Sequence, residues 1–170
     1  MVNIQAKTYS EEEIWDMLRE VTDPEIPVLN VVEMGIVRDV ITKDDHVEIK
    51  ITPTYSGCPA MKAIEQLINL KLAEKGVEHF DVEVVYEEAW TTEWMTEEAR
   101  QKLNEYGIAP PRHLDKTEDD IFEPESENVI KCPYCDSEDT RKEAEFGSTA
   151  CKAQYFCENC HQPYEYFKCH

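Results

Sequence analysis

The sequence predicts an α+β protein, with a small mixed sheet covered by helices on one face, followed by a small C-terminal zinc-ribbon-like domain. Helix and strand patterns alternate over the first 90 residues, and six of the seven cysteines lie between residues 132 and 169. The net charge of −20 is uneven, since residues 1–90 hold 19 acidic against 8 basic side chains and residues 129–170 only 7 against 5. We therefore expect an N-terminal domain over residues 1–108, an acidic linker over 109–128 and a cysteine-rich domain over 129–170.

The first helix is predicted to begin after Ser10. Ser10 and Glu13 fit a capping box, in which a hydroxyl and a carboxylate satisfy the free amides of a helix start. Apolar residues then recur at helical spacing through Val21, and Asp23-Pro24 ends the helix because the residue before proline avoids helical angles.

Three strands are predicted in this domain. Residues 36–41 are rich in β-branched side chains, and residues 47–51 alternate between apolar and polar, as in a strand with one wet face. The turn residues 43–45 between them predict a hairpin. Val82, Val84 and Tyr86 mark the third strand.

Two more helices are expected. One runs from Pro59 to Lys75 and ends at Gly76, with its apolar residues on one face. Another begins after Thr96 and ends near Gly107. The aromatic residues Trp90, Trp94 and Tyr106 could form a docking face, but core packing is the more ordinary explanation and the one that we expect for Trp90 and Tyr106.

Charge and hydropathy exclude two classes of partner. A net charge of −20 repels nucleic-acid phosphates and anionic lipid headgroups. No apolar run approaches the ~20 residues of a membrane helix, and residues 1–10 lack a signal-peptide pattern. We expect a cytoplasmic protein that binds neither nucleic acid nor membrane. The oligomeric state is left open, a homodimer included.

Cys58 is the first candidate for chemistry. Proline is favoured at the first helical position, so Pro59 makes Cys58 the expected N-cap, where free amides and the positive end of the helix dipole meet. Such a site favours the thiolate, which attacks sulfur or binds metal. A small buried cysteine that fills a helix–strand junction explains the residue equally well.

Asp23-Pro24-Glu25 forms an acidic turn that could point toward the Cys58 loop. There, Asp23 and Glu25 would change the pKa of the thiol or help to bind a metal. A plain helix-ending turn explains the same residues and is the more ordinary interpretation.

The strongest motif is a pair of C-x-x-C sequences, Cys132/Cys135 and Cys157/Cys160, with 21 residues between them. Four thiolates at tetrahedral corners suit zinc, and a segment of about 40 residues without a large core needs such a cross-link to fold. Iron or an iron–sulfur cluster uses the same ligands. The sequence predicts a metal site and leaves the metal open.

Cys151 and Cys169 exceed what one tetrahedral site needs. They are candidates for transient ligands of iron or a cluster, for a redox pair, or for packed thiols. His161 follows Cys160 directly, and we expect it to face solvent.

These motifs carry two family resemblances. Asp23-Pro24-Glu25, Gly35-Ile36-Val37 and the segment from Thr52 to Pro59 resemble the iron–sulfur cluster assembly family, which includes cytosolic cluster-targeting factors and SufT-type bacterial proteins. The rest of the chain resembles the D-subunit family of the phenylacetyl-CoA epoxidase (ring 1,2-monooxygenase) system. The residues that carry this resemblance are segment 90–94, segment 106–111, both C-x-x-C motifs, segment 146–152 and the ending 167–170.

The resemblance implies an accessory role in aerobic phenylacetate degradation. That system uses a di-iron oxygenase subunit, a structural partner and a reductase with flavin and an iron–sulfur cluster, and its D-type component is similar to maturation factors. It implies that Cys58 is the reactive position and that Asp23 and Glu25 lie beside it. We expect a non-catalytic factor that assembles or repairs an iron–sulfur or di-iron centre of the other subunits. The alternative is a structural zinc-binding subunit that docks the oxygenase without handling iron.

Overall fold

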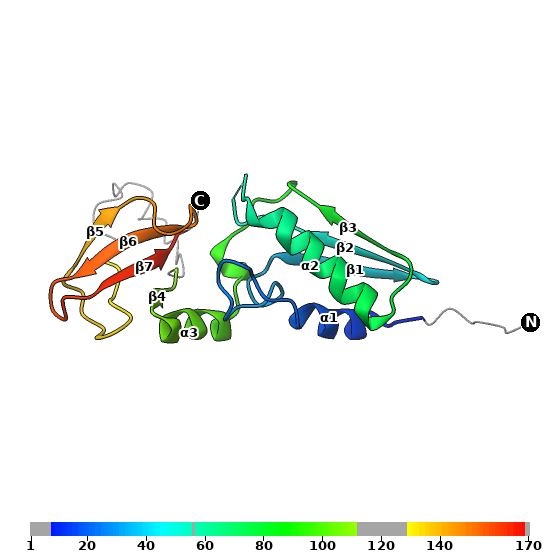
Figure 1. The fold of residues 1–170 in the computed structure, drawn as a ribbon, viewed down its shortest axis with the longest axis horizontal. Coiled ribbons are helices and arrows are strands. Elements are labelled where there is room, and N and C mark those ends of the chain that lie inside the picture. Colours follow the sequence, from blue (N-terminus) through cyan, green and yellow to red (C-terminus); the bar gives the residue numbers. More distant parts are fainter. Residues whose placement is uncertain (1–7, 56, 112–128, 169–170) are drawn as a thin grey trace, which may run out of the picture. The chain divides into compact units, whose positions relative to one another are not determined.

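Residues 8–55, 57–111 and 129–168 are described by a computed structural model (Figure 1). Their contacts divide the chain into two compact units, with the division between Trp90 and Thr91. Each described helix is too short or too polar to cross a bilayer.

The first unit contains a three-stranded mixed sheet with two helices on one face (Figure 1). The elements are α1 (Glu11–Arg19), β1 (Val37–Lys43), β2 (His46–Ile51), α2 (Ala60–Lys75) and β3 (Phe80–Val84). β2 lies in the middle, antiparallel to β1 and parallel to β3. The predicted fold class is therefore confirmed for this part.

Buried and partly exposed side chains alternate along β2, and this alternation shows where the core of the first unit lies. Val47, Ile49 and Ile51 are buried, while the side chains between them are partly exposed. Helix α1 adds Ile14 and Leu18 to this core, and α2 adds Ile64, Ile68 and Leu72. A sheet with one apolar face is stable only when another layer covers that face, which the two helices do.

Local sequence signals set the helix ends much as predicted. The Ser10–Glu13 capping box is present, with the Glu13 amide 3.2 Å from the Ser10 hydroxyl. Helix α2 ends at Gly76, which takes the left-handed backbone that glycine permits. Its first residue is Ala60, so Pro59 and not Cys58 is the N-cap.

The second unit begins with a 3₁₀ turn, η1 (Thr92–Trp94), and helix α3 (Glu97–Tyr106). A four-stranded sheet follows, in the order β4-β7-β6-β5. Its strands are β4 (Ile108–Ala109), β5 (Thr140–Ala144), β6 (Lys152–Cys157) and β7 (Pro163–Phe167). β4 pairs in parallel with β7, and the other pairs are antiparallel.

The contacts thus group residues 91–108 with the cysteine-rich ribbon (residues 129–168) in the second unit, whereas the sequence predicts that they belong to the N-terminal domain. The physical reason is backbone pairing, since β4 adds its hydrogen bonds to β7. Buried Arg100 reinforces this arrangement by donating to the backbone oxygens of Pro111 and Thr92, the latter at 2.6 Å. Residues 112–128, most of the expected linker, lie outside the described residues, and the domain boundaries stay a prediction.

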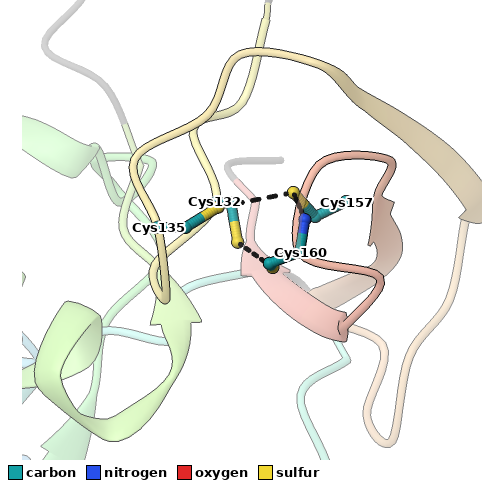
Figure 2. Close-up of side chains that lie close together, drawn as sticks. All are labelled: Cys132, Cys135, Cys157 and Cys160. Carbon is teal, nitrogen blue, oxygen red and sulfur yellow. Dashed lines mark hydrogen bonds between the residues drawn. The ribbon is translucent and has the colours of Figure 1, made fainter.

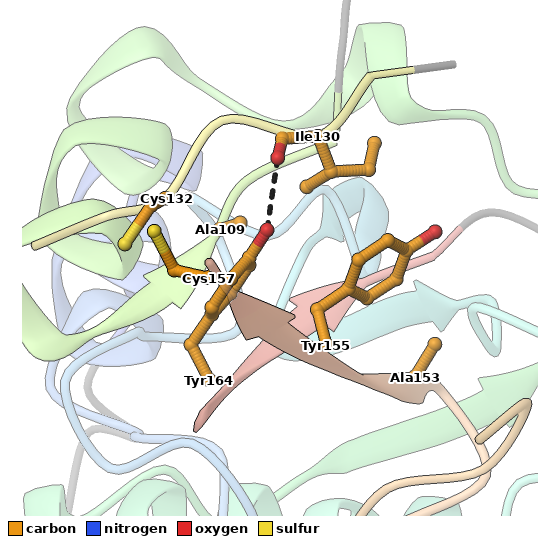
Figure 3. Packing of buried hydrophobic residues seen from close by; sticks show 7 residues of the cluster. All are labelled: Ala109, Ile130, Cys132, Ala153, Tyr155, Cys157 and Tyr164. Atoms are coloured by element: carbon orange, nitrogen blue, oxygen red, sulfur yellow. Dashed lines mark hydrogen bonds between the residues drawn. The ribbon is translucent and has the colours of Figure 1, made fainter. Parts of the chain in front are cut away.

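The core of the second unit is small and contains two cysteines (Figure 3). Tyr164 crosses it, and its hydroxyl donates to the Ile130 oxygen at 2.8 Å. The ring of Tyr155 stacks beside Tyr164 at 5.7 Å between centroids. The buried members of this core are Ala109, Ile130, Cys132, Ala153, Tyr155, Cys157 and Tyr164.

The two aromatic residues expected in the core differ in how deeply they are buried. Trp90 is buried, and its ring nitrogen donates to the Met34 oxygen at 3.0 Å. Tyr106 is 54% exposed, so the prediction of a core position was wrong. It is the last residue of α3, where the helix turns away at Gly107.

Substitutions at the two ends of α3 should have unequal effects. Thr96→Ala removes the hydroxyl that accepts from the Ala99 amide and should cost about 1 kcal/mol. Gly107→Ala places a Cβ 2.6 Å from the Tyr134 hydroxyl on a backbone with φ of +88°, so it should cost more, roughly 2 kcal/mol. Chemical denaturation of both variants measures the difference. A Gly107→Ala protein as stable as the wild type would contradict the packing described.

Candidate functional site

The four thiols of the C-x-x-C motifs come together in the second unit (Figure 2). The Sγ atoms of Cys132 and Cys160 are 3.6 Å apart, and those of Cys135 and Cys157 are also 3.6 Å apart. All four sulfurs lie within 4.8 Å of one another. In a tetrahedral site with metal–sulfur bonds of about 2.3 Å, neighbouring sulfurs are about 3.8 Å apart. The cluster therefore has the size that could hold one metal ion.

Both C-x-x-C turns have the same backbone hydrogen bonds. The Cys132 amide donates to the Ser137 oxygen at 3.0 Å, and the Cys157 amide donates to the Gln162 oxygen at 3.0 Å. In each turn the residue after the second cysteine has a φ of +57° and returns its amide to the first cysteine's oxygen; these residues are Asp136 and His161. The two halves of the site are thus built alike, although their sequences share only the cysteines.

Burial and hydrogen bonding affect the thiols in opposite directions. Burial raises the pKa of the Cys132 thiol to about 12. The Ser137 amide and the Asn159 side chain donate to the Cys135 sulfur and lower the pKa of that thiol to about 6. A bound cation would favour the thiolate at every position and would release protons.

Cys58 lies in the first unit, just before α2. It is half-buried, and its sulfur accepts hydrogen bonds from the amides of Ala60 and Met61. The backbone before it turns tightly, with the Cys58 amide 3.2 Å from the Tyr55 oxygen. The thiol therefore sits at the free amides of a helix start, as the sequence predicts, although it is one residue before the N-cap.

The expected lowering of the Cys58 pKa does not occur. Burial raises the pKa of the thiol above its ordinary value, and the charges of Glu25 and Asp23 raise it further. The amides of Ala60 and Met61 lower it, but by less than burial and the two carboxylates together raise it. Cys58 is therefore a protonated thiol near neutral pH, and a cation beside it would be needed to favour the thiolate.

The acidic turn does lie near Cys58, close enough for both carboxylates to act on its pKa. Asp23 has a structural role as well, because its buried Oδ1 accepts from the amides of Glu25 at 2.7 Å and Ile26 at 2.8 Å. Glu25 is more exposed than Asp23. The turn thus combines both interpretations of the sequence, a fixed helix-ending turn and a negative neighbour of the thiol.

Cys151 is not among the four clustered thiols. It is buried just before β6, and its Sγ lies 3.1 Å from the Thr149 hydroxyl. His161 is exposed, as expected, and Cys169 lies outside the described residues. Neither of the two described candidates, Cys151 and His161, belongs to the four-thiol cluster.

Some contributors to these sites could not be found from the sequence. The amides of Ala60 and Met61 act through the backbone, so their side chains carry no signal. Asn159 is a side-chain donor, 3.7 Å from the Cys135 sulfur, and only its position inside the second C-x-x-C motif could have indicated it.

Two family models match the chain. The model of the iron–sulfur cluster assembly protein matches residues 11–86. The model of the PaaD zinc beta ribbon domain matches residues 116–168. The first contains Cys58 and the acidic turn, and the second contains all four clustered cysteines.

Known proteins similar to this chain fall into two groups. The chain is 43% identical over 163 residues to the putative D component of the 1,2-phenylacetyl-CoA epoxidase of Escherichia coli, covering 92% of each chain. It is 38% identical to the Fe-S protein maturation auxiliary factor of Porphyromonas gingivalis, covering 55% of this chain and 90% of that protein.

The fold of the first unit also has solved relatives. A crystal structure of a domain of unknown function, DUF59, from Bacillus anthracis matches with a TM-score of 0.52 and 29% identity, covering 55% of this chain and 90% of that one. The similarity to the E. coli protein spans 92% of each chain, and within this chain the cluster assembly model matches ahead of the zinc beta ribbon model. The chain belongs to the D-subunit family of 1,2-phenylacetyl-CoA epoxidases and matches the models of both an iron–sulfur cluster assembly protein and a zinc beta ribbon.

Proposed function

We propose that this chain is a non-catalytic accessory subunit that assembles or repairs an iron-containing centre of a 1,2-phenylacetyl-CoA epoxidase. The names of its relatives, an epoxidase subunit and an Fe–S maturation factor, support the proposal. The observation on which it rests is the environment of Cys58, whose half-buried thiol has two amide donors and two carboxylates nearby. In this proposal the ring chemistry belongs to the other subunits, and the work takes place in the cytoplasm.

The chemistry of Cys58 suits a transient contact with iron. The free thiol keeps its proton, because burial and the carboxylates of Glu25 and Asp23 oppose the thiolate. When a ferrous ion or a cluster iron binds the sulfur, the proton leaves and the same carboxylates stabilise the added positive charge. Because a proton competes with the metal for the sulfur, the thiol holds the metal weakly. A weakly held metal can be released to a target protein.

We assign a different role to the four clustered thiols, which in our proposal hold zinc. Two of them, Cys132 and Cys157, are fully buried members of the core. Four protein ligands close a tetrahedral site and leave no position for a substrate, as in structural zinc centres. The buried sulfurs are then part of the fold of the second unit, and iron handling is confined to Cys58.

The closed four-thiol site also favours the second candidate, a structural subunit that docks the oxygenase without handling iron. That candidate requires the ribbon but gives Cys58 no role. The two functions therefore differ in what a substitution at Cys58 does.

Cys58→Ser should lower the iron content of the epoxidase several-fold when this chain is produced together with the other subunits. The hydroxyl keeps the hydrogen bonds of the site but does not bind iron at neutral pH. Iron and iron–sulfur absorbance of the purified oxygenase and reductase subunits measure the effect. Cys151→Ser is the matched control and should leave the iron content unchanged. Equal iron with both variants would favour the structural subunit instead.

The pH dependence of Cys58 alkylation should show no plateau near neutrality. With the pKa raised above its ordinary value, the thiolate fraction and the reaction rate should rise about tenfold per pH unit from pH 7 to 9. Glu25→Gln removes a negative charge and should shift the profile to lower pH. Mass spectrometry of iodoacetamide-treated protein measures the rate at Cys58 itself. A rate that levels off at pH 7 would mean that the thiol is already ionised.

Removal of zinc should unfold the second unit and leave the first intact. Structural zinc contributes on the order of 10 kcal/mol, more than so small a core supplies. We expect about one zinc per chain, lost in Cys132→Ser, with NMR signals of the second unit collapsing while those of the first persist. Cys151→Ser should keep both metal and fold. A Cys132→Ser protein with an intact ribbon would disprove the structural role.

A further inference from the structure

The four clustered thiols make two contacts that each cross from one C-x-x-C motif to the other (Figure 2). The sulfur of Cys132 is in hydrogen-bond contact with that of Cys160 at 3.6 Å. The sulfur of Cys135 has the same contact with that of Cys157, also at 3.6 Å. We call these the cross-motif pairs. Their members are neighbours in the folded ribbon, although they lie 28 and 22 positions apart along the chain.

Each cross-motif pair combines one buried and one half-buried sulfur. Cys132 and Cys157 are 0% exposed, whereas Cys135 and Cys160 are half-buried. A small oxidant that arrives from solvent therefore meets Cys135 or Cys160 first, because oxidation of a cysteine follows its exposure. The sulfur that would react next is the buried member of the pair, which already touches the first.

A covalent bond along a cross-motif pair would link the two halves of the ribbon. It would close a loop of 28 or 22 positions, whereas a bond inside one motif would close a loop of only three. A disulfide restricts the unfolded chain more when the loop that it closes is longer. The cross-motif pairs can therefore replace the link that a bound metal supplies between the two turns, and bonds inside the motifs cannot.

We propose that the four-thiol cluster is a redox switch, in which hydrogen peroxide forms the disulfides Cys132–Cys160 and Cys135–Cys157 and the second unit stays folded after its metal has left. The inference rests on the proposed function only for the identity of that metal as zinc. Reduction of the two disulfides returns all four ligands, so the same ribbon can take up its metal again.

The oxidation takes two steps at each cross-motif pair. The half-buried thiolate attacks hydrogen peroxide, whose O–O bond breaks, and a sulfenic acid and a hydroxide ion form. The buried thiolate then attacks the sulfenic sulfur, an S–S bond forms, and a second hydroxide ion leaves. Two peroxide molecules thus accept the four electrons that four thiolates lose, and these sulfurs release the ion that they held.

The test maps the disulfides of the full chain after oxidation. Zinc-loaded protein is treated with hydrogen peroxide, and the remaining thiols are blocked with N-ethylmaleimide at acidic pH, where disulfides do not exchange. Proteolysis after Tyr134 and after Glu158 separates the two cysteines of each motif, because these residues lie between them. Mass spectrometry of the joined peptides then distinguishes cross-motif disulfides from disulfides inside a motif.

We expect the pairing Cys132–Cys160 and Cys135–Cys157, with about one zinc ion released for every four thiols lost. Cys151→Ser is the matched control, because Cys151 is a buried thiol outside the cluster. This variant should give the same pairing and the same zinc release as the wild type.

Two zinc-free samples separate the effect of the disulfides from that of metal loss. Protein stripped by a chelator in the presence of a reductant should lose the NMR signals of the second unit. Protein that has lost its zinc to peroxide should keep them. Dithiothreitol and zinc should return the oxidised protein to its starting spectrum.

Disulfides inside the motifs, Cys132–Cys135 or Cys157–Cys160, would overturn the proposal. Four thiols that stay reduced in excess peroxide would also overturn it, as would an oxidised protein whose second unit unfolds. The zinc assignment fails separately: a protein that carries another metal and still forms the two cross-motif disulfides would refute zinc and leave the switch in place.

Discussion

The stability of the second unit depends on how the charge of four cysteine sulfurs is balanced, because these sulfurs lie within 4.8 Å of one another. Two of them belong to the core, where burial is the largest cause that raises the pKa of the Cys132 thiol to about 12. Thiols at this spacing offer little cohesion, and thiolates without a cation would repel each other. A divalent ion in the middle reverses both effects, because it stabilises the thiolates and links two turns that are distant in sequence. In our proposal, this link holds together the strands from β4 to β7.

Cys58, in contrast, is a single thiol in surroundings that disfavour its charged form. Its sulfur is half-buried and has two amide donors, but the nearby charges of Glu25 and Asp23 oppose the thiolate. A buried tetrahedral set retains a metal, whereas a single thiol that must lose a proton to bind one also lets it go. This difference in retention is our reason for assigning structure to the ribbon and iron transfer to the first unit.

Much of the fold could be predicted from the sequence because its signals are local. The Ser10–Glu13 capping box, the alternation in β2 and the stop at Gly76 each act within a few residues. The spacing of the C-x-x-C motifs likewise predicted the thiol cluster. The pKa direction at Cys58 could not be predicted, because burial and the carboxylates of Glu25 and Asp23, which the fold brings near the thiol, together outweigh the helix amides. The exposure of Tyr106 and the pairing of β4 with β7 also depend on tertiary packing.

X-ray absorption on anaerobically purified protein tests the separation of the two metals most directly. We predict zinc bound by four sulfurs at about 2.3 Å, with any iron present below one equivalent and absent from the Cys58→Ser variant. Iron with four sulfur ligands, retained in Cys58→Ser and lost in Cys132→Ser, would contradict this separation. That result would place the iron chemistry in the ribbon.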